Sequence, residues 1–211
     1  MDLARTRDHF RRHVIPPRYS ARAHIVFFCL FELVAIFLTG SFVDWSWRSP
    51  VYVLLCFAWA TTFVYLIHRF TLHRKVPGFG WAFRLHHWHH AIYLPGHMQY
   101  EELNDVYMLL MPPWIQGLYF FVYLPALAVA LSFVLPLTFI FHLLFALTLW
   151  YALYEAVHWV EHLSDEHPLS RFKIVQGLQE HHVWHHHPEF RDHCNFGIVE
   201  PSHDYLWGTK R

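Results

Sequence analysis

The sequence predicts an all-α integral membrane protein, with four transmembrane helices and a histidine-rich helical cap on the cytoplasmic side. Long apolar stretches, the placement of lysine and arginine, and clustered histidines predict this fold class. Hydrophobic residues make up 55% of the 211 residues and charged residues only 15%, against about 25% charged in typical soluble domains. The formal net charge is zero, so the composition does not favour a nucleic-acid partner. We expect a single membrane domain over residues 1–211.

Four apolar stretches are long enough to cross a bilayer, which takes about 20 mostly apolar residues. Glu32 is the one charged residue that interrupts the first stretch. Residues 106–157 are almost continuously apolar, which is too long for one crossing and suits two, with a turn near Leu135 and Pro136. Pro125 falls inside the third crossing and should kink it. We expect the spans at about 25–43, 51–67, 114–135 and 137–157.

Lysine and arginine orient these spans. Arg48 is the one basic residue between the first and second spans, and the turn between the third and fourth spans has none, so 15 of the 16 basic residues fall on the opposite side. The positive-inside rule makes that side cytoplasmic. Four spans then return both termini to the cytoplasm, together with the segments at about 68–105 and 158–211 that would form the cap.

Histidine is unusually frequent, with 21 residues, and four clusters of it follow helical spacing. His158 and His162 are four apart and share one face of a helix, and two triplets with i, i+3, i+4 spacing do the same. His68 and His73 are five apart, about 140° around an ideal helix. They can reach one ion only if that helix end unwinds; otherwise they serve two ions.

These clusters predict a metal site, because a neutral imidazole is the commonest protein ligand for a transition metal. A tetrahedral zinc ion takes at most four ligands, so a larger set indicates two ions. The set is nearly all nitrogen, which suits iron, zinc or copper, and it lacks the regular glutamates of soluble di-iron bundles. We expect the cap to hold a di-metal centre, with ten candidate ligands: His68, His73, His86, His89, His90, His158, His162, His182, His185 and His186.

Other functions of histidine stay open at this point. The run from His158 to His162 matches the inverted zinc-peptidase motif with Glu161 as general base, but that function leaves three clusters unexplained. A membrane metal transporter or metal-binding protein is the alternative outside enzymes. Transporters place ligands near the bilayer midplane, whereas these clusters lie at span ends. His142 lies inside the fourth span, where we expect a packed or hydrogen-bonded core residue.

Several short motifs accompany the histidine clusters in a specific order. The pieces are His68-Arg-Phe-Thr-Leu-His73, His86-x-x-His89-His90, Leu94-Pro95, Met111-Pro112-Pro113, Tyr154-Glu-Ala-Val-His158-x-x-x-His162, His182-x-x-His185-His186, Asn195-Phe196-Gly197 and Asp204-Tyr-Leu-Trp-Gly208-Thr209. With this order and spacing, the chain from about Tyr65 to Thr209 resembles the membrane-bound fatty acid hydroxylase and sterol desaturase superfamily, the histidine-box di-iron proteins.

The resemblance implies two iron ions on the cytoplasmic face of a four-span bundle, with O₂ as co-substrate and with zinc able to replace iron in a purified sample. It implies an O₂-dependent hydroxylase that acts on an unactivated C–H bond of a membrane lipid, a fatty acyl, sterol-like or related chain. The run Glu102-Leu103-Asn104-Asp105 looks like the carotenoid β-ring hydroxylases. A carotenoid ring hydroxylase or a lipid desaturase on the same centre therefore stays open.

No haem domain and no flavin or nicotinamide phosphate loop is visible in the sequence. We therefore expect a separate electron donor, cytochrome b5-like or ferredoxin-like. Residues beside the ligands should orient the imidazoles. In the last cluster His181 and His187 offer a second register, and the resemblance favours the one that begins at His182, because it gives the expected spacing to Asn195. The candidates for the orienting role are Glu155, Glu161, Asp105 and Asn195.

Overall fold

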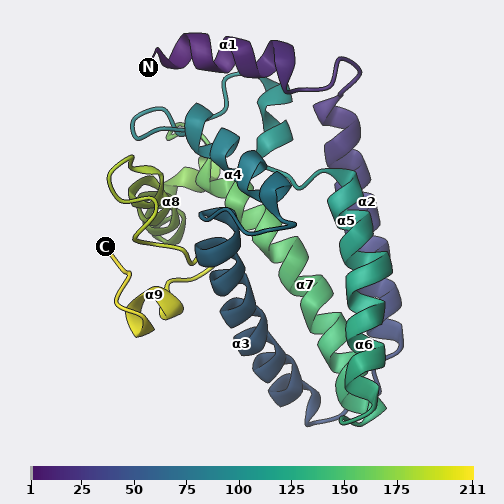
Figure 1. The fold of residues 1–211 in the computed structure, drawn as a ribbon. Coiled ribbons are helices and arrows are strands. Elements are labelled where there is room, and N and C mark those ends of the chain that lie inside the picture. Colours follow the sequence, from purple (N-terminus) through teal and green to yellow (C-terminus); the bar gives the residue numbers. More distant parts are fainter. Residues whose placement is uncertain (1) are drawn as a thin grey trace. The chain divides into compact units, whose positions relative to one another are not determined.

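The computed structural model describes residues 2–211, which form helices and loops and contain no strand (Figure 1). The predicted fold class, an all-α chain with four helices apolar enough to cross a membrane, is confirmed. The chain divides into two compact units. The histidine unit consists of the N-terminal segment up to Ala21, Thr61–Leu110 and Tyr154–Arg211, and the span unit consists of Arg22–Ala60 and Met111–Leu153. The single domain over residues 1–211 stays a prediction.

Each predicted span overlaps one of the four apolar helical segments, but the boundaries differ. The second segment runs on to Leu72, through the first histidine cluster, and the third begins at Leu103, well before residue 114. Hydropathy marks where apolar residues stop, whereas helical turns continue into the polar flanks. The observed segments are Ala21–Ser41, Ser49–Leu72, Leu103–Ser132 and Leu137–Glu161.

The third segment is assembled from short helical pieces. The 3-10 helix η2 (Leu103–Met108) comes first, and α5 (Pro113–Leu118) then begins on a proline, whose fixed φ suits a first helical turn. The π-helix η3 (Tyr119–Tyr123) leads directly into α6 (Leu124–Ser132). Pro125 has no N–H group, and its ring crowds the preceding turn. The irregularity next to this proline therefore takes the form of a π-helical turn.

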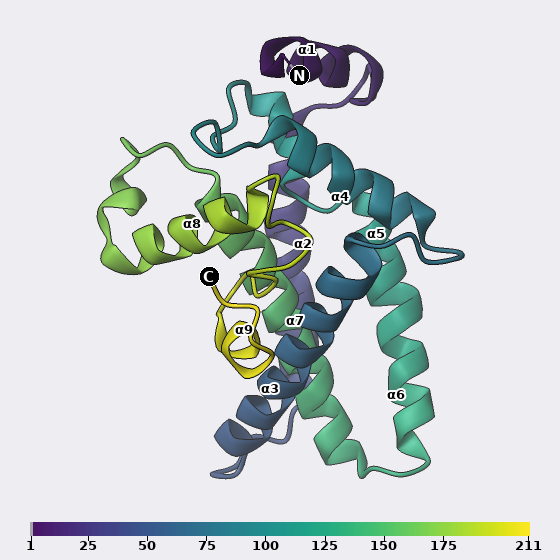
Figure 2. The ribbon, with the colours of Figure 1, turned by 60° about the vertical axis from the view of Figure 1, so that its left-hand side comes forward.

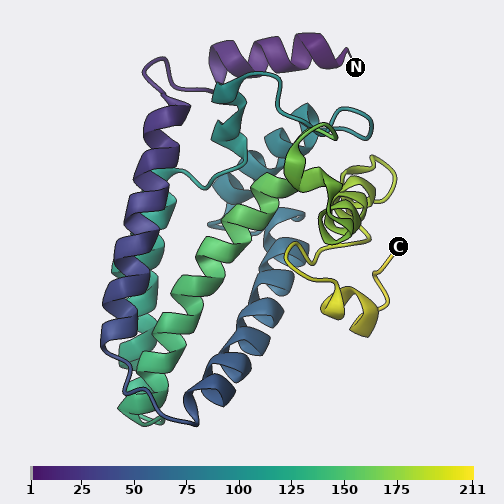
Figure 3. The ribbon, with the colours of Figure 1, turned by 180° about the vertical axis from the view of Figure 1, so that it is seen from behind.

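In the span unit, α2 (Ala21–Ser41) lies alongside the α5–α6 segment, as Figures 1 and 3 both show. Phe31 of α2 packs edge-on against Phe120, with ring centroids 5.1 Å apart. Glu32 is buried, and its Oε1 accepts a hydrogen bond of 2.6 Å from Nε2 of Gln116. The one acidic interruption of the first apolar stretch is thus paired inside the protein and does not face lipid.

The remaining two long helices are α3 (Ser49–Ile67) and α7 (Leu137–Glu161). His142 of α7 is fully buried; its Nδ1 lies 2.6 Å from the carbonyl oxygen of Thr138, and its Nε2 lies 2.8 Å from Oγ of Ser49. Because a carbonyl only accepts, Nδ1 carries the proton and Nε2 accepts from the serine hydroxyl. His142 is therefore a hydrogen-bonded core residue, as predicted.

The histidine unit consists of shorter helices joined by loops. In this unit α1 (Leu3–His13) contacts α4 (Gly80–Ile92), and η4 (Pro168–Arg171) leads into α8 (Lys173–His186). Figure 2 shows the chain after α8 turning back beside that helix and then forming α9 (Ser202–Leu206). The loops of this unit supply most of the groups that orient the histidines.

We expect Gln116→Leu to lower the thermal unfolding temperature of the protein in detergent, because it leaves the buried Glu32 carboxyl group without its donor. An unsatisfied buried polar group costs about 1–3 kcal/mol. Replacing both partners by leucine removes the polar groups together and should recover most of that loss. Unfolding followed by circular dichroism compares the three chains. A double variant less stable than Gln116→Leu alone would contradict the pairing.

Candidate metal centre

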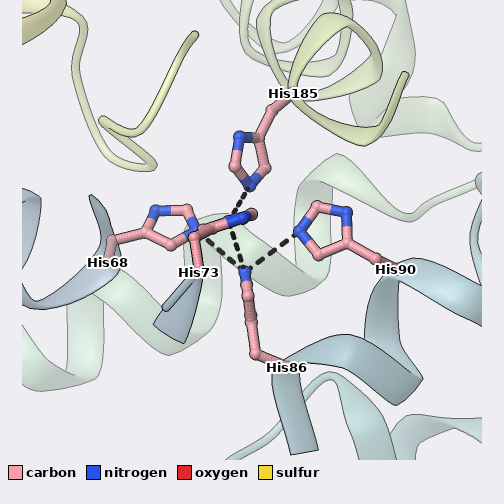
Figure 4. Close-up of side chains that lie close together, drawn as sticks. All are labelled: His68, His73, His86, His90 and His185. Atoms are coloured by element: carbon pink, nitrogen blue, oxygen red, sulfur yellow. Dashed lines mark hydrogen bonds between the residues drawn. The ribbon is translucent and has the colours of Figure 1, made fainter. Parts of the chain in front are cut away.

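The histidine unit brings nine of the ten predicted ligands together in two groups, and the tenth lies beside the second group. In each group one nitrogen from every ring lies within 4.8 Å of the others. The first histidine group is His68, His73, His86, His90 and His185, which Figure 4 shows converging on one point. The second histidine group is His89, His162, His182 and His186. His158 adjoins the second group, with its Nε2 3.2 Å from Nε2 of His89.

A π-helix brings His68 and His73 to the same side of the chain. The π-helix η1 (His68–Leu72) begins at the first of these residues and ends just before the second. Its hydrogen bonds connect residues five apart, so residue 73 lies nearly over residue 68. The two ring centroids are 5.1 Å apart. An ideal α-helix would have to unwind for these two rings to share one ion. Here the chain does so by forming one wider, π-helical turn.

Each histidine triplet divides its residues between the two groups. On α4, His86 and His90 join the first group and His89 joins the second; on α8 the pattern is reversed, with His185 alone in the first group. Residues i and i+4 share a helix face, whereas i+3 points about 100° away from i+4. Each group therefore combines the i, i+4 pair of one helix with the i+3 residue of the other.

Backbone carbonyls fix the orientation of six of the ten rings through Nδ1. Since a carbonyl oxygen only accepts hydrogen bonds, Nδ1 carries the proton in each ring and Nε2 keeps its lone pair for the centre. The pairs are His68 with Phe196 at 2.6 Å, His89 with Met108 at 3.1 Å, His158 with Leu109 at 3.1 Å, His162 with Met98 at 2.6 Å, His185 with Cys194 at 3.0 Å and His186 with Tyr93 at 2.8 Å.

Carboxylates face two further rings. Nδ1 of His73 donates to Oδ1 of Asp192 at 3.0 Å. The buried Glu161 places Oε2 3.5 Å from Nδ1 of His182, beyond a good hydrogen bond. Glu161 was among the predicted orienting residues and Asp192 was not. Asp192 is a half-exposed loop residue, so its position in the sequence gives no sign of this role. Backbone carbonyls give no sign either, because every residue type has one.

The Nε2 atoms face one another at distances that hydrogen bonding does not explain. Nε2 of His73 lies 3.2 Å from Nε2 of His185, and the His89–His158 pair has the same separation. All four rings carry their proton on Nδ1, and a neutral imidazole has only one N–H group. The facing atoms are therefore lone pairs. Two nitrogens bound at right angles to one metal ion lie about 3 Å apart, so a cation between them matches this spacing.

Burial keeps these imidazoles neutral. Burial, followed by the neighbouring histidines, lowers the pKa of His86, His89, His90 and His185 well below the usual value of 6.5. For His73, burial lowers the pKa to about 4 although Asp192 opposes the shift. Neutral imidazole is the form that binds a metal ion. The donor set thus fits two transition-metal ions bound through Nε2.

Two of the other predicted orienting residues bind groups other than the ligand rings. Asp105 binds Arg11, with Nε to Oδ1 at 2.8 Å and Nη2 to Oδ2 at 2.7 Å. Asn195 adopts a positive φ of 53°, and its Nδ2 donates to the carbonyl oxygen of His181 at 2.9 Å. Glu155 is buried in α7, one turn before His158. Asp105 and Asn195 therefore support the segments around the rings.

Asp204 holds the loop that orients part of the first group. Its carboxylate accepts hydrogen bonds from the backbone N–H groups of Phe196 and Gly197, both at 2.8 Å, and from Oγ1 of Thr209 at 2.7 Å. A side chain at Gly197 would meet the carbonyl oxygen of Glu200 at 2.3 Å. The closing motifs of the sequence thus fix the loop whose Phe196 carbonyl accepts from His68.

His181 belongs to neither histidine group. Its Nε2 lies 3.4 Å from Oδ2 of Asp204. The ring of His187 stacks on Phe190, with centroids 4.8 Å apart. The structure therefore brings the triplet that begins at His182 to the centre.

Asp204→Asn should lower stability at neutral pH and remove part of the acid sensitivity of the protein. Burial alone raises the pKa of Asp204, but the His181 ring 3.4 Å away and hydrogen bonds from Thr209 and two backbone amides outweigh it and hold that pKa below its ordinary value. A carboxylate with a depressed folded-state pKa stabilises the fold above the unfolded-state pKa of about 4 and loses this contribution at lower pH. The difference in unfolding temperature between the two chains should therefore shrink as pH falls from about 7 to 3. A constant difference would contradict this role.

Among protein-family models none matches the sequence, and no curated protein matches it. Among solved structures, the chain is similar to one titled "Full length scs7p (only hydroxylase domain visible)", with a TM-score of 0.59 and 22% sequence identity. The similarity covers 87% of this chain and 64% of the Scs7p chain. This chain therefore spans less than two thirds of the length of the solved structure. The chain therefore shares the fold of the Scs7p hydroxylase domain, which agrees with the fold implied by the resemblance to the fatty acid hydroxylases.

Proposed function

We propose that the protein is an O₂-dependent, non-haem di-iron hydroxylase that acts on an unactivated C–H bond of a membrane lipid. The observation that carries this proposal is that Nε2 lone pairs face each other in two places. In the His73–His185 and His89–His158 pairs, the Nε2 atoms of two neutral imidazoles lie 3.2 Å apart with no proton between them. The hydroxylase title of the structural neighbour and the four apolar helices support it. A carotenoid ring hydroxylase and a lipid desaturase would use the same centre.

The ten histidines would hold two iron ions, with five rings around the first ion, and with four rings and the adjoining His158 around the second. When bound, the ions supply the reductive activation of O₂. The chain contributes ligand orientation through the Nδ1 contacts, and it excludes bulk water, since His89, His182, His185 and His186 are at most 2% exposed. A dry site limits side reactions of a reactive oxidant.

The overall reaction balances with an external donor. One oxygen atom of O₂ enters the lipid as a hydroxyl group, and the other leaves as water, with two electrons from that donor and two protons from the solvent. We expect the donor to be a separate cytochrome b5-like or ferredoxin-like protein. By the positive-inside rule, donor and metal centre would meet on the cytoplasmic side.

Metal content tests the centre itself. The protein purified from iron-supplemented cells should hold about two metal ions per chain, and His185→Ala and His182→Ala should each lose about one, because each removes a ligand from a different group. His193→Ala is the matched control, since this exposed histidine belongs to neither group. Elemental analysis together with circular dichroism separates ligand loss from unfolding. A wild-type chain with one ion or none would contradict the di-metal centre.

Lipid analysis tests the reaction. Extracts of cells that express the wild-type chain should contain a lipid that has gained one oxygen atom, and this product should be absent with His89→Ala or His185→Ala but present with His193→Ala. Loss of two hydrogens in place of this gain would indicate a desaturase, and a change confined to pigments a carotenoid hydroxylase. Metal flux into the cells with no oxidised lipid would contradict the enzyme proposal and favour a transporter.

A further inference from the structure

One short stretch of chain, residues 92–109, orients most of the second histidine group and its neighbour His158. It lies between the end of α4 and the end of η2 and contains little regular structure. Four of its backbone carbonyls accept hydrogen bonds from Nδ1 of the histidines. The four pairs are Tyr93 with His186, Met98 with His162, Met108 with His89 and Leu109 with His158.

The N-terminal helix α1 holds the first part of this stretch through Arg7. The Arg7 side chain is only 4% exposed. Its Nε donates to the carbonyl oxygen of Ile92 at 2.9 Å, and Nη2 donates to those of His97 at 2.7 Å and Gln99 at 3.2 Å. A third nitrogen, Nη1, forms an ion pair with Glu101. Tyr93 and Met98, two of the four orienting residues, are direct neighbours of the carbonyls that Arg7 binds.

Arg11, one helical turn later, holds the second part. Its guanidinium forms a two-point contact with Asp105 and further contacts with Glu101 at 3.1 Å and Glu102 at 3.0 Å. The buried Asp105 also accepts hydrogen bonds from the backbone N–H groups of Glu101 and Glu102. The hydroxyl of Tyr93 donates to the carbonyl oxygen of Asp105 at 3.0 Å, which connects the two parts. Arg11 thus anchors η2, whose end supplies the Met108 and Leu109 carbonyls.

The first histidine group depends on a different segment. Asp192, Cys194 and Phe196 face His73, His185 and His68. Asp204 holds that loop at Phe196 and Gly197. The two groups are therefore oriented by separate parts of the chain, one fixed by the N-terminal helix and the other by the C-terminal residues.

We propose that Arg7 and Arg11 of α1 are positioning residues for the second metal site, so that the N-terminal helix determines the occupancy of that site independently of the first. The guanidinium group suits this role because its five N–H donors form a rigid fork that reaches several oxygens at once. A lysine has its three donors on a single atom, which cannot replace both Nε at the Ile92 carbonyl and Nη2 at the His97 and Gln99 carbonyls. The inference rests on the proposed function, in that it requires two metal ions.

Metal counting in paired backgrounds tests this role. Arg7→Met removes the donors while preserving the buried aliphatic stem, and we expect it to hold about one ion where the wild type holds about two. Adding His162→Ala, a ligand of the second group, should cause no further loss, whereas adding His68→Ala from the first group should remove the remaining ion. Arg12→Met is the matched control, because this arginine of the same helix pairs only locally with Asp8 at the surface.

A second readout does not depend on metal. In the metal-free chains, backbone hydrogen exchange over residues 92–109 should be faster in Arg7→Met than in Arg12→Met, and exchange over residues 192–209 should be unchanged. Arg7→Lys should resemble Arg7→Met in both experiments.

The failures of the two proposals can be told apart. A wild-type chain without two ions would contradict the proposed function. A wild-type chain with two ions and an Arg7→Met chain that also keeps two would overturn the positioning role alone. Equal losses from both groups, with uniformly faster exchange, would show that Arg7 acts only on global stability and would also overturn it.

Discussion

The hydrogen bond from histidine Nδ1 to a backbone carbonyl or carboxylate oxygen is the interaction on which the site depends. An imidazole can present either nitrogen, and this bond selects Nε2 for the centre by placing the proton on the other side of the ring. In the His73–His185 and His89–His158 pairs it also leaves two lone pairs facing each other at 3.2 Å. Without a cation such contacts are repulsive, and a metal ion bound between the two nitrogens would remove that repulsion.

Sequence spacing predicted much of this arrangement, because helix geometry is local. The i, i+3, i+4 triplets and the His158–His162 pair identified the rings that lie together, and hydropathy located four apolar helices. Spacing could not predict how the triplets divide, since the division depends on where α4 and α8 face each other. The π-helical turn at His68 is likewise invisible to a pattern that assumes an ideal helix.

The orienting groups were the least predictable part of the site. Carboxylates were expected, and Glu161 does lie beside His182, but most of the rings donate to backbone carbonyls, which any residue type can supply. Arg7 and Arg11 lie outside the region of the sequence resemblance, roughly residues 65–209, and nothing in their spacing indicates that they clamp residues more than 80 positions away. Long-range contacts of this kind become apparent only when the loops are folded.

The central claim is that the Nε2 atoms of the two histidine groups bind two metal ions. Anomalous X-ray diffraction from crystals of the iron-loaded protein, recorded on either side of the iron absorption edge, tests it most directly. We expect two anomalous peaks in each chain, one enclosed by the Nε2 atoms of the first group and one by those of the second. A single peak, a peak coordinated through Nδ1, or iron bound away from both groups would contradict it.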